Sequence, residues 1–227
     1  TMTNIKHTKG ACILCGCQMT SYGMSRHLST CAKRNEAINI ANQTSESAQY
    51  LYHLKIKDTY TGNYWLYLEM NDNANLFDLD DYLRAIWLEC CGHLSEFTIY
   101  NTRQKINMRT KAKNILEPGM TLLHIYDFGT SSKTLIEVVD ERFGQPLTTH
   151  PIFLMARNEP PEILCQKCER PATVLIPEWM EIERDLFTLC EKHARKILGD
   201  SYSETLPIVN SPRTGMCGYT GPAEPPY

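Results

Sequence analysis

The sequence predicts an α+β protein with a central ββα-βββ domain, β-grasp-like in layout, and a zinc-binding module on either side. Two observations predict this class. Between residues 50 and 158, short segments of alternating apolar and polar residues surround one segment of helical spacing. Outside that region, cysteine and histidine occur in closely spaced pairs, as the ligands of tetrahedral zinc do. A chain of 227 residues has room for one mid-sized domain and small modules.

The composition is that of an ordinary globular protein, with 42% hydrophobic and 22% charged residues. A net charge of -3 excludes a general basic bias, but the charge is unevenly distributed. Residues 1–34 carry five basic residues and no acidic one, and residues 101–113 repeat that balance. No apolar segment approaches a membrane span or a signal-peptide core, so we expect a cytoplasmic protein without a membrane partner. Ten cysteines in such a chain favour metal over disulfides.

The N-terminal 40 residues are predicted to form a CCHC zinc finger and its helix. Cys12-x2-Cys15 is followed, after 11 residues, by His27-x3-Cys31. The second pair lies four residues apart, on one face of a helix. Because so short a unit cannot bury a sufficient core, zinc would contribute on the order of 10 kcal/mol to its folding.

Two basic groups are candidates for contact with phosphates or with a protein partner. Arg26 occupies a base-reading position of the finger helix and can donate to a base edge. The simpler alternative is that these residues only form a solvated basic face. If they do contact a partner, nucleic-acid contact and protein docking both stay open. The candidate contact residues are Arg26, Lys33, Arg34, Arg103, Lys105, Arg109, Lys111 and Lys113.

A polar linker, residues 41–49, precedes the central α+β domain, residues 50–158. Alternation predicts strands in YLYHLKIKD, YWLYLEM, EFTIY, TLLHIYDF, KTLIEVVDE and PIFLMARN. Apolar residues from Leu76 to Trp87 recur at helical spacing, with Gly92 as the expected C-cap. The expected arrangement is one helix against a mostly antiparallel sheet.

Residues 159–200 are predicted to form a treble-clef-like zinc module. Cys165-x2-Cys168 is separated by 21 residues from Cys190-x2-His193, and the second pair opens the helical sequence LCEKHARKILG. One ligand pair on a turn and one on the first turn of a helix is the treble-clef arrangement. We therefore expect two zinc ions in the chain and no small-molecule cofactor.

Residues 201–227 form an arm rich in glycine and proline, without helical or strand periodicity. Its apolar residues favour an arm folded back on the domain, whereas residues 222–227 are expected to fray. Cys217 is interpreted as a spare thiol, and Cys90 and Cys91 as neighbours at a helix end.

Two motifs of the central domain carry a resemblance to a known family. GHLSEFTIY (92–100) and HIYDFG (124–129), after a ββα unit, resemble the plasmid pRiA4b ORF-3-like family, also labelled IS1096 passenger TnpR-like. The likeness extends over residues 50–157, and LMARNEPPEILCQKC and NSPRTGMCGYTG are similar to a zinc-bearing subgroup. Where family members continue YDFG with an aspartate and then a tryptophan, this chain has Thr130 and Ser132. The resemblance implies a small α+β fold and no particular reaction.

The polar residues of these motifs define the candidate pocket of an enzyme. His93, Glu96, Tyr126 and Asp127 could meet at one edge of the sheet as an acid/base or metal pair. The alternative is that they cap the helix and fasten loops. That alternative is favoured because the sequence has no nucleophile motif or phosphate-binding loop beside them.

The sequence therefore favours a zinc-binding, non-enzymatic interaction protein that contacts nucleic acid or a protein partner. One alternative is an enzyme with a site near His93, Glu96 and Asp127. Another is a purely structural or regulatory module that docks onto a protein.

Overall fold

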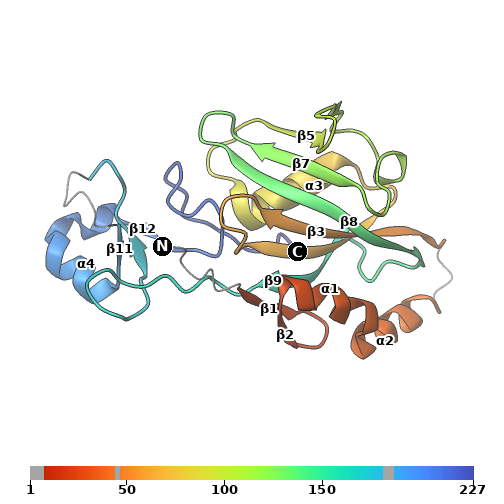
Figure 1. The fold of residues 1–227 in the computed structure, drawn as a ribbon, viewed down its shortest axis with the longest axis horizontal. Coiled ribbons are helices and arrows are strands. Elements are labelled where there is room, and N and C mark those ends of the chain that lie inside the picture. The colour runs from red at the N-terminus through yellow and green to blue at the C-terminus, as the bar shows by residue number, and fades with distance from the viewer. Residues whose placement is uncertain (1–7, 44–46, 181–186) are drawn as a thin grey trace.

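The computed structural model describes residues 8–43, 47–180 and 187–227, and its largest element is a nine-stranded sheet (Figure 1). The strand order is β2-β1-β9-β4-β3-β8-β7-β5-β6, and the described pairings are antiparallel. The predicted α+β class is confirmed. The strands are β1 (Lys9–Cys12), β2 (Gln18–Thr20), β3 (Gln49–Asp58), β4 (Trp65–Asn71), β5 (Ser95–Ile99), β6 (Lys105–Ile106), β7 (Thr121–Tyr126), β8 (Ser132–Gly144) and β9 (Ile152–Asn158). The α-helices of the described residues are α1 (Ser21–Thr30), α2 (Ala32–Ala41), α3 (Leu76–Leu83) and α4 (Glu191–Leu198).

Both faces of the sheet are covered, because β4 is apolar on both sides. Leu66 and Leu68 belong to the main core, which they share with residues of α3. Trp65 and Tyr67 belong to a second apolar cluster, which they share with Met24 of α1. Successive side chains of a strand point to opposite faces, so α3 and α1 cover opposite faces of the sheet.

The central helix begins at a well-defined cap and ends earlier than predicted. Asn75 caps α3 through a capping box with Asp78. Beyond α3 the chain makes one wider π-helical turn, η1 (Arg84–Leu88), and leaves the helix at Glu89. The predicted helix end at Gly92 is therefore wrong, and the two cysteines before Gly92 lie in a loop.

The N-terminal segment extends the main sheet rather than standing apart from it. Strand β1 pairs with β9, with Gly10 opposite Asn158. A side chain at Gly10 would place its Cβ 2.2 Å from the carbonyl oxygen of Arg157 and 2.5 Å from the Trp65 ring, so only glycine fits. The predicted linker follows α2, and its residues 44–46 lie outside the described part of the chain.

A small unit lies beside the main sheet (Figure 1). Its three short strands have the order β11-β10-β12, and α4 packs against them through Leu189 and Ala194. Residues 181–186, inside the predicted treble-clef-like module, are not among those described. The strands are β10 (Val174–Leu175), β11 (Thr188–Leu189) and β12 (Leu206–Pro207).

The C-terminal arm leaves β12 and returns to the central domain. The Arg213 side chain is fully buried there. The expected fraying of residues 222–227 is wrong, because Ala223 is only 3% exposed and the Tyr227 ring stacks on His150 at 3.9 Å. No helix in the described part of the chain is both long and apolar enough to cross a membrane.

Candidate metal centres

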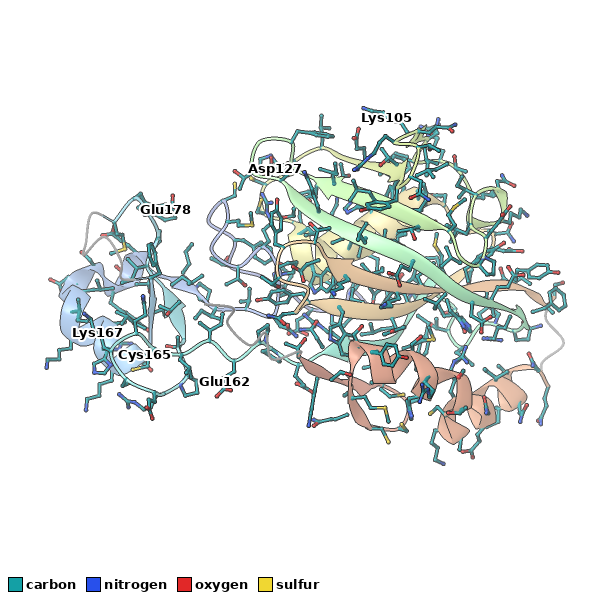
Figure 2. The ribbon with its side chains drawn as sticks, viewed as in Figure 1. Lys105, Asp127, Glu162, Cys165, Lys167 and Glu178 are labelled. Carbon is teal, nitrogen blue, oxygen red and sulfur yellow. The ribbon has the colours of Figure 1, made fainter. Side chains whose placement is uncertain are left out.

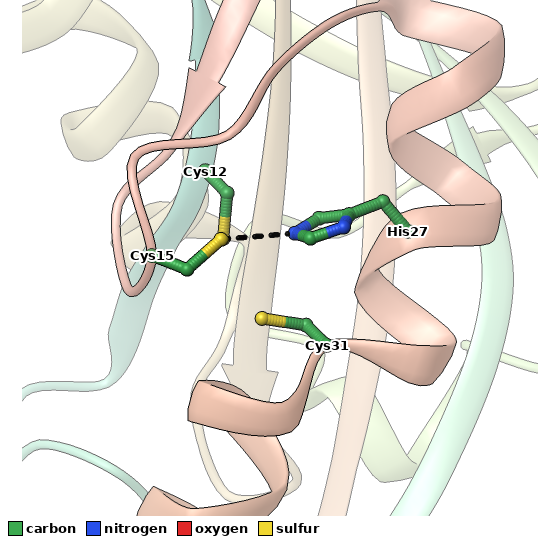
Figure 3. A group of neighbouring side chains, drawn as sticks. All are labelled: Cys12, Cys15, His27 and Cys31. Atoms are coloured by element: carbon green, nitrogen blue, oxygen red, sulfur yellow. Dashed lines mark hydrogen bonds between the residues drawn. The ribbon is translucent and has the colours of Figure 1, made fainter.

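The N-terminal ligand group consists of Cys12, Cys15, His27 and Cys31 (Figure 3). Cys12 ends β1, Cys15 lies in the turn before β2, and α1 carries His27 with Cys31 directly after its last residue. The four ligand atoms lie within 4.8 Å of one another, and Cys15 Sγ is 3.2 Å from His27 Nε2. A strand end, a tight turn and one helix face thus direct four ligands at one point.

The thiols of this group differ in how readily they lose a proton. Burial raises the pKa of Cys12 to about 11. Burial also opposes ionisation of Cys15, but hydrogen bonds from the Cys17 amide and from neighbouring thiols outweigh it and lower the pKa of Cys15 to about 6. At neutral pH, Cys15 is therefore the first thiolate available to a metal, and further binding must displace protons from its neighbours.

The C-terminal ligand group consists of Cys165, Cys168, Cys190 and His193. Cys190 is the N-cap of α4 and His193 lies in its first turn, so this helix start presents two ligands. His193 Nδ1 lies 3.4 Å from Cys165 Sγ and 3.6 Å from Cys190 Sγ, and the sulfurs of Cys168 and Cys190 are 4.0 Å apart. The Arg170 guanidinium donates to the sulfurs of Cys168 and Cys190, which offsets thiolate charge.

These separations suit one four-coordinate ion in each group. Zinc bonds of about 2.3 Å to sulfur and 2.0 Å to nitrogen place tetrahedral ligand atoms about 3.5 to 3.8 Å apart. The distances given above for the two groups, 3.2 to 4.0 Å, bracket that range. Thiolate and imidazole ligands favour zinc among the common metals. Each predicted ligand set is thus brought together in a form that could hold a metal ion.

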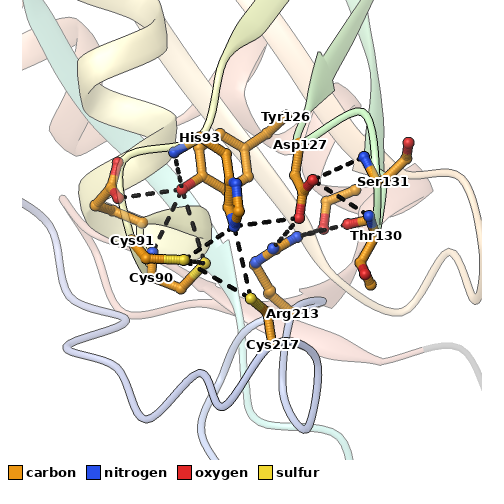
Figure 4. A network of polar contacts seen from close by, with 12 residues as sticks. Cys90, Cys91, His93, Tyr126, Asp127, Thr130, Ser131, Arg213 and Cys217 are labelled. Carbon is orange, nitrogen blue, oxygen red and sulfur yellow. Dashed lines mark hydrogen bonds and ion pairs between the residues drawn. The ribbon is translucent and has the colours of Figure 1, made fainter.

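The structure also gathers a third set that the sequence analysis did not predict. Cys90, Cys91, His93 and Cys217 place four ligand atoms within 4.8 Å of one another (Figure 4). The available signal was the CCxH spacing of the first three. Its fourth member lies more than a hundred residues further along the chain.

The structure brings together only some of the residues of the candidate enzyme pocket. His93 Nε2 lies 3.4 Å from Asp127 Oδ2, and the rings of His93 and Tyr126 are 5.8 Å apart (Figure 4). The Glu96 carboxylate instead pairs with Lys105 Nζ at 2.6 Å. The four residues therefore do not form one acid/base group.

Asp127 is occupied by structural contacts. Its Oδ1 accepts hydrogen bonds from the amides of Gly129 and Thr130, and its Oδ2 lies 2.6 Å from Nη2 of Arg213. Burial would raise the pKa of Asp127, but Arg213 and these amides hold it below its usual range. Its conformation has a φ of +64°, which these contacts stabilise. Asp127 thus fastens the arm rather than facing an open site.

The candidate basic residues occupy two separate places. Arg34 lies inside the protein, 5% exposed and 3.1 Å from Glu69, whereas Arg26 and Lys33 are exposed. The other five are exposed in β6 and in the segments on either side of it, at the opposite edge of the sheet from β2. Figure 2 shows Lys105 far from the N-terminal helices. Seven strand spacings of about 4.8 Å separate β1 from β6, which is roughly 34 Å, so the two groups do not form one continuous patch.

Comparison with known proteins leaves the family of this chain open. No family model matches it, and no curated protein does. A crystal structure of a Methanosarcina mazei Go1 protein of unknown function is similar at 19% identity, with a TM-score of 0.40. The match covers 45% of this chain and 66% of that protein, so it spans slightly less than two thirds of the neighbour.

Proposed function

We propose that this chain is a zinc-binding, non-enzymatic interaction protein that contacts nucleic acid through its exposed basic segment. In this proposal the N-terminal group is a CCHC zinc finger and the C-terminal group is a treble-clef-like module, each with one structural zinc ion. The observation that carries the proposal is that each group supplies four protein ligands. A catalytic zinc keeps a position open for water or substrate, whereas a four-ligand set is typical of structural zinc.

The segment from residue 103 to 113 is the best-placed contact surface. Its five basic side chains are exposed, and within the described part of the chain only Lys105 among them pairs with an acid, Glu96. Four uncompensated charges on one short segment attract phosphates. The short edge strand β6 also benefits from a lysine, because charge at a sheet edge discourages pairing with other chains. Edge protection alone would not produce nucleic-acid binding, so a titration separates the two roles.

The finger helix supports a structural role more than base reading. Met24 and Leu28 are buried against the sheet, and Arg26 lines a groove of about 330 Å³ together with Asp140 of β8. A helix seated in this way cannot enter a major groove as a free finger does. This packing favours the second candidate, a purely structural protein-docking module, for the N-terminal end.

The enzyme alternative has less support. Glu96 and Asp127 are held in separate ion pairs, with Lys105 and Arg213. Membership of residues 50–158 in the pRiA4b ORF-3-like family stays part of the proposal and rests on the motifs of that segment.

The test is a filter-binding titration of the full chain against duplex DNA and RNA at several salt concentrations. We expect binding at low salt with a slope of log K against log salt of about −3.6 if four phosphates are contacted. Replacing Arg109, Lys111 and Lys113 by Gln should weaken binding and flatten that slope.

The matched control replaces Lys133, Lys192 and Lys196 by Gln. These three lysines are also exposed, so the change in net charge is the same. If both triple variants bind equally, the attraction is general and the segment is not the contact surface. If the unchanged chain shows no salt-sensitive binding, the nucleic-acid proposal fails and protein docking remains.

A further inference from the structure

Two distant parts of the chain meet at a group of three thiols and one imidazole (Figure 4). Cys90, Cys91 and His93 lie in the loop after η1, and Cys217 lies in the C-terminal arm. Their three sulfur atoms and one ring nitrogen lie within 4.8 Å of one another, and all three cysteines are free thiols. This combination has the same donor set, three sulfurs and one nitrogen, as the two groups predicted from spacing.

The separations within the group match those expected around one ion. His93 Nε2 lies 2.9 Å from Cys91 Sγ and 3.5 Å from Cys217 Sγ. Cys91 Sγ lies 3.4 Å from Cys90 Sγ and 3.7 Å from Cys217 Sγ. Three of these four distances lie within the 3.2 to 4.0 Å range of the two predicted groups. The sulfur atoms are too far apart for disulfides, whose bond is about 2.05 Å.

We propose that Cys90, Cys91, His93 and Cys217 form a third metal site, which binds one Zn²⁺ with four protein ligands and fastens the C-terminal arm to the central domain. Three soft thiolates with one imidazole select zinc over hard cations such as Mg²⁺ or Ca²⁺. Because all four ligands come from the protein, the ion would be structural. The site would close a loop of more than 120 residues in the sequence.

The surroundings hold both sides of the site in place independently of an ion. On the loop side, the amides of Cys90 and His93 lie 3.4 Å and 3.3 Å from the Tyr126 hydroxyl, to which they donate. On the arm side, Arg213 lies four residues before Cys217, and its Nη2 atom is 2.6 Å from Oδ2 of Asp127. Ligands that are already oriented lose less conformational freedom when a metal binds.

The buried charge of Arg213 suits an ion with three thiolate ligands. Such a complex carries one net negative charge, since three thiolates outweigh the two positive charges of zinc. The Arg213 guanidinium is fully buried over the Tyr126 ring at 4.9 Å, and the Tyr126 hydroxyl lies 3.8 Å from Cys90 Sγ. A positively charged donor next to a thiolate cluster stabilises it, as Arg170 does beside the C-terminal group.

The site is tested by counting metal in the full chain, expressed in zinc-supplemented medium and purified under reducing conditions. We expect about three zinc ions per chain, one for each ligand group, and one fewer in Cys217→Ser. Cys217 is exposed, so a serine there should not prevent folding. The matched control is Cys17→Ser, which changes another exposed cysteine outside the three groups and should leave the count unchanged.

Substitution with Co²⁺ gives a second readout. Thiolate ligation to cobalt produces an intense charge-transfer absorption. The difference between the spectra of the unchanged chain and Cys217→Ser should therefore show the absorption of one tetrahedral thiolate site. Hydrogen exchange should show faster exchange in the arm of Cys217→Ser, with β3 and β8 unaffected.

Several results would overturn the proposal. One is an unchanged zinc count in Cys217→Ser. Another is a count of about two in the unchanged chain, with Cys91 joined to Cys217 in a disulfide or with both thiols free by mass spectrometry. The inference goes beyond the proposed function and does not depend on it. The nucleic-acid titration reports on residues 103 to 113, whereas the metal count reports on this group.

Discussion

Replacing Glu69 by Gln should strongly destabilise the attachment of the N-terminal segment to the sheet. Glu69 lies on β4, only 2% exposed. Its carboxylate lies 2.6 Å from Arg142 of β8, 3.1 Å from Arg34 of α2 and 3.1 Å from His53 of β3. Glutamine keeps the shape of the side chain but leaves the buried Arg34 and the largely buried Arg142 without their counter-charge. Breaking a buried pair in this way costs about 3 to 5 kcal/mol.

The pH dependence of stability gives an independent value for the free energy that the ionised Glu69 contributes. Burial alone would raise the pKa of Glu69, but hydrogen bonds from His53 and Arg142 and the charge of Arg142 outweigh it and lower the pKa from 4.5 to about 2. A group whose pKa falls on folding stabilises the native state fully above its unfolded pKa. That contribution, about 3 kcal/mol, is lost as the pH falls from about 4.5 towards 2.

The assay is urea unfolding of the unchanged chain and of Glu69→Gln at pH 7 and at steps down to pH 3, with zinc present. Acid also protonates the cysteine ligands, so the informative quantity is the difference in unfolding free energy between the two proteins at each pH. We expect that difference to be largest at neutral pH and to shrink below pH 4.5.

The control is Glu36→Gln, because Glu36 pairs with Lys33 on the surface, with side chains 57% and 64% exposed. An exposed pair of this kind contributes at most about 1 kcal/mol. If Glu69→Gln costs no more than Glu36→Gln, or if its effect does not change with pH, the buried network does not hold the N-terminal segment.

Two further substitutions, the second with a matched control, test the modules at either end. Replacing Cys168 by Ala should release one metal ion and loosen only the C-terminal unit, which metal analysis and hydrogen exchange would show; faster exchange in β3 as well would reveal tighter coupling than expected. Gly10→Ala should cost about 1 to 3 kcal/mol in urea unfolding, because its Cβ would lie 2.2 Å from the Arg157 carbonyl oxygen. Gly23→Ala in α1 meets its nearest neighbour at 3.4 Å and should stabilise by up to about 1 kcal/mol, so equal effects of the two changes would contradict the packing at Gly10.

The two predicted ligand sets could be recognised from the sequence because all their spacings are local. Each set consists of two pairs in which the ligands lie within four residues of each other. Such short spacings can be recognised without knowing the fold. Cys217 has no such neighbour, and its partners follow from how the arm crosses the central domain. The third group therefore became visible only in three dimensions.

The position of the N-terminal segment on the sheet also depends on strand pairing between residues far apart in the sequence. The sequence YWLYLEM predicts β4, and its apolar residues on both faces are typical of a strand covered on both sides. That pattern indicates that something covers the second face, but not that α1 does so or that β1 pairs with β9. The role of Arg34 was hidden for a similar reason. A sum of charges along the chain counts Arg34 as basic surface, whereas Glu69 lies 35 residues away on the strand that Arg34 contacts.

The two ends of the chain are attached to the sheet by the same combination of interactions. At the N-terminal end, Arg34 enters the interior and pairs with Glu69, and it lies three residues after the candidate ligand Cys31. At the C-terminal end, Arg213 is fully buried and pairs with Asp127, and it lies four residues before the candidate ligand Cys217.

In both places a buried ion pair is expensive to break, and an ion held by four ligands would add a constraint that the pair alone cannot supply. Two of the polar residues of the family-like motifs are held in separate ion pairs, Glu96 with Lys105 and Asp127 with Arg213. Asp127 joins the arm to the domain through Arg213, and His93 Nε2 lies 3.4 Å from the same carboxylate. In the proposed function, partner contact therefore falls to the exposed edge of the sheet and not to this region.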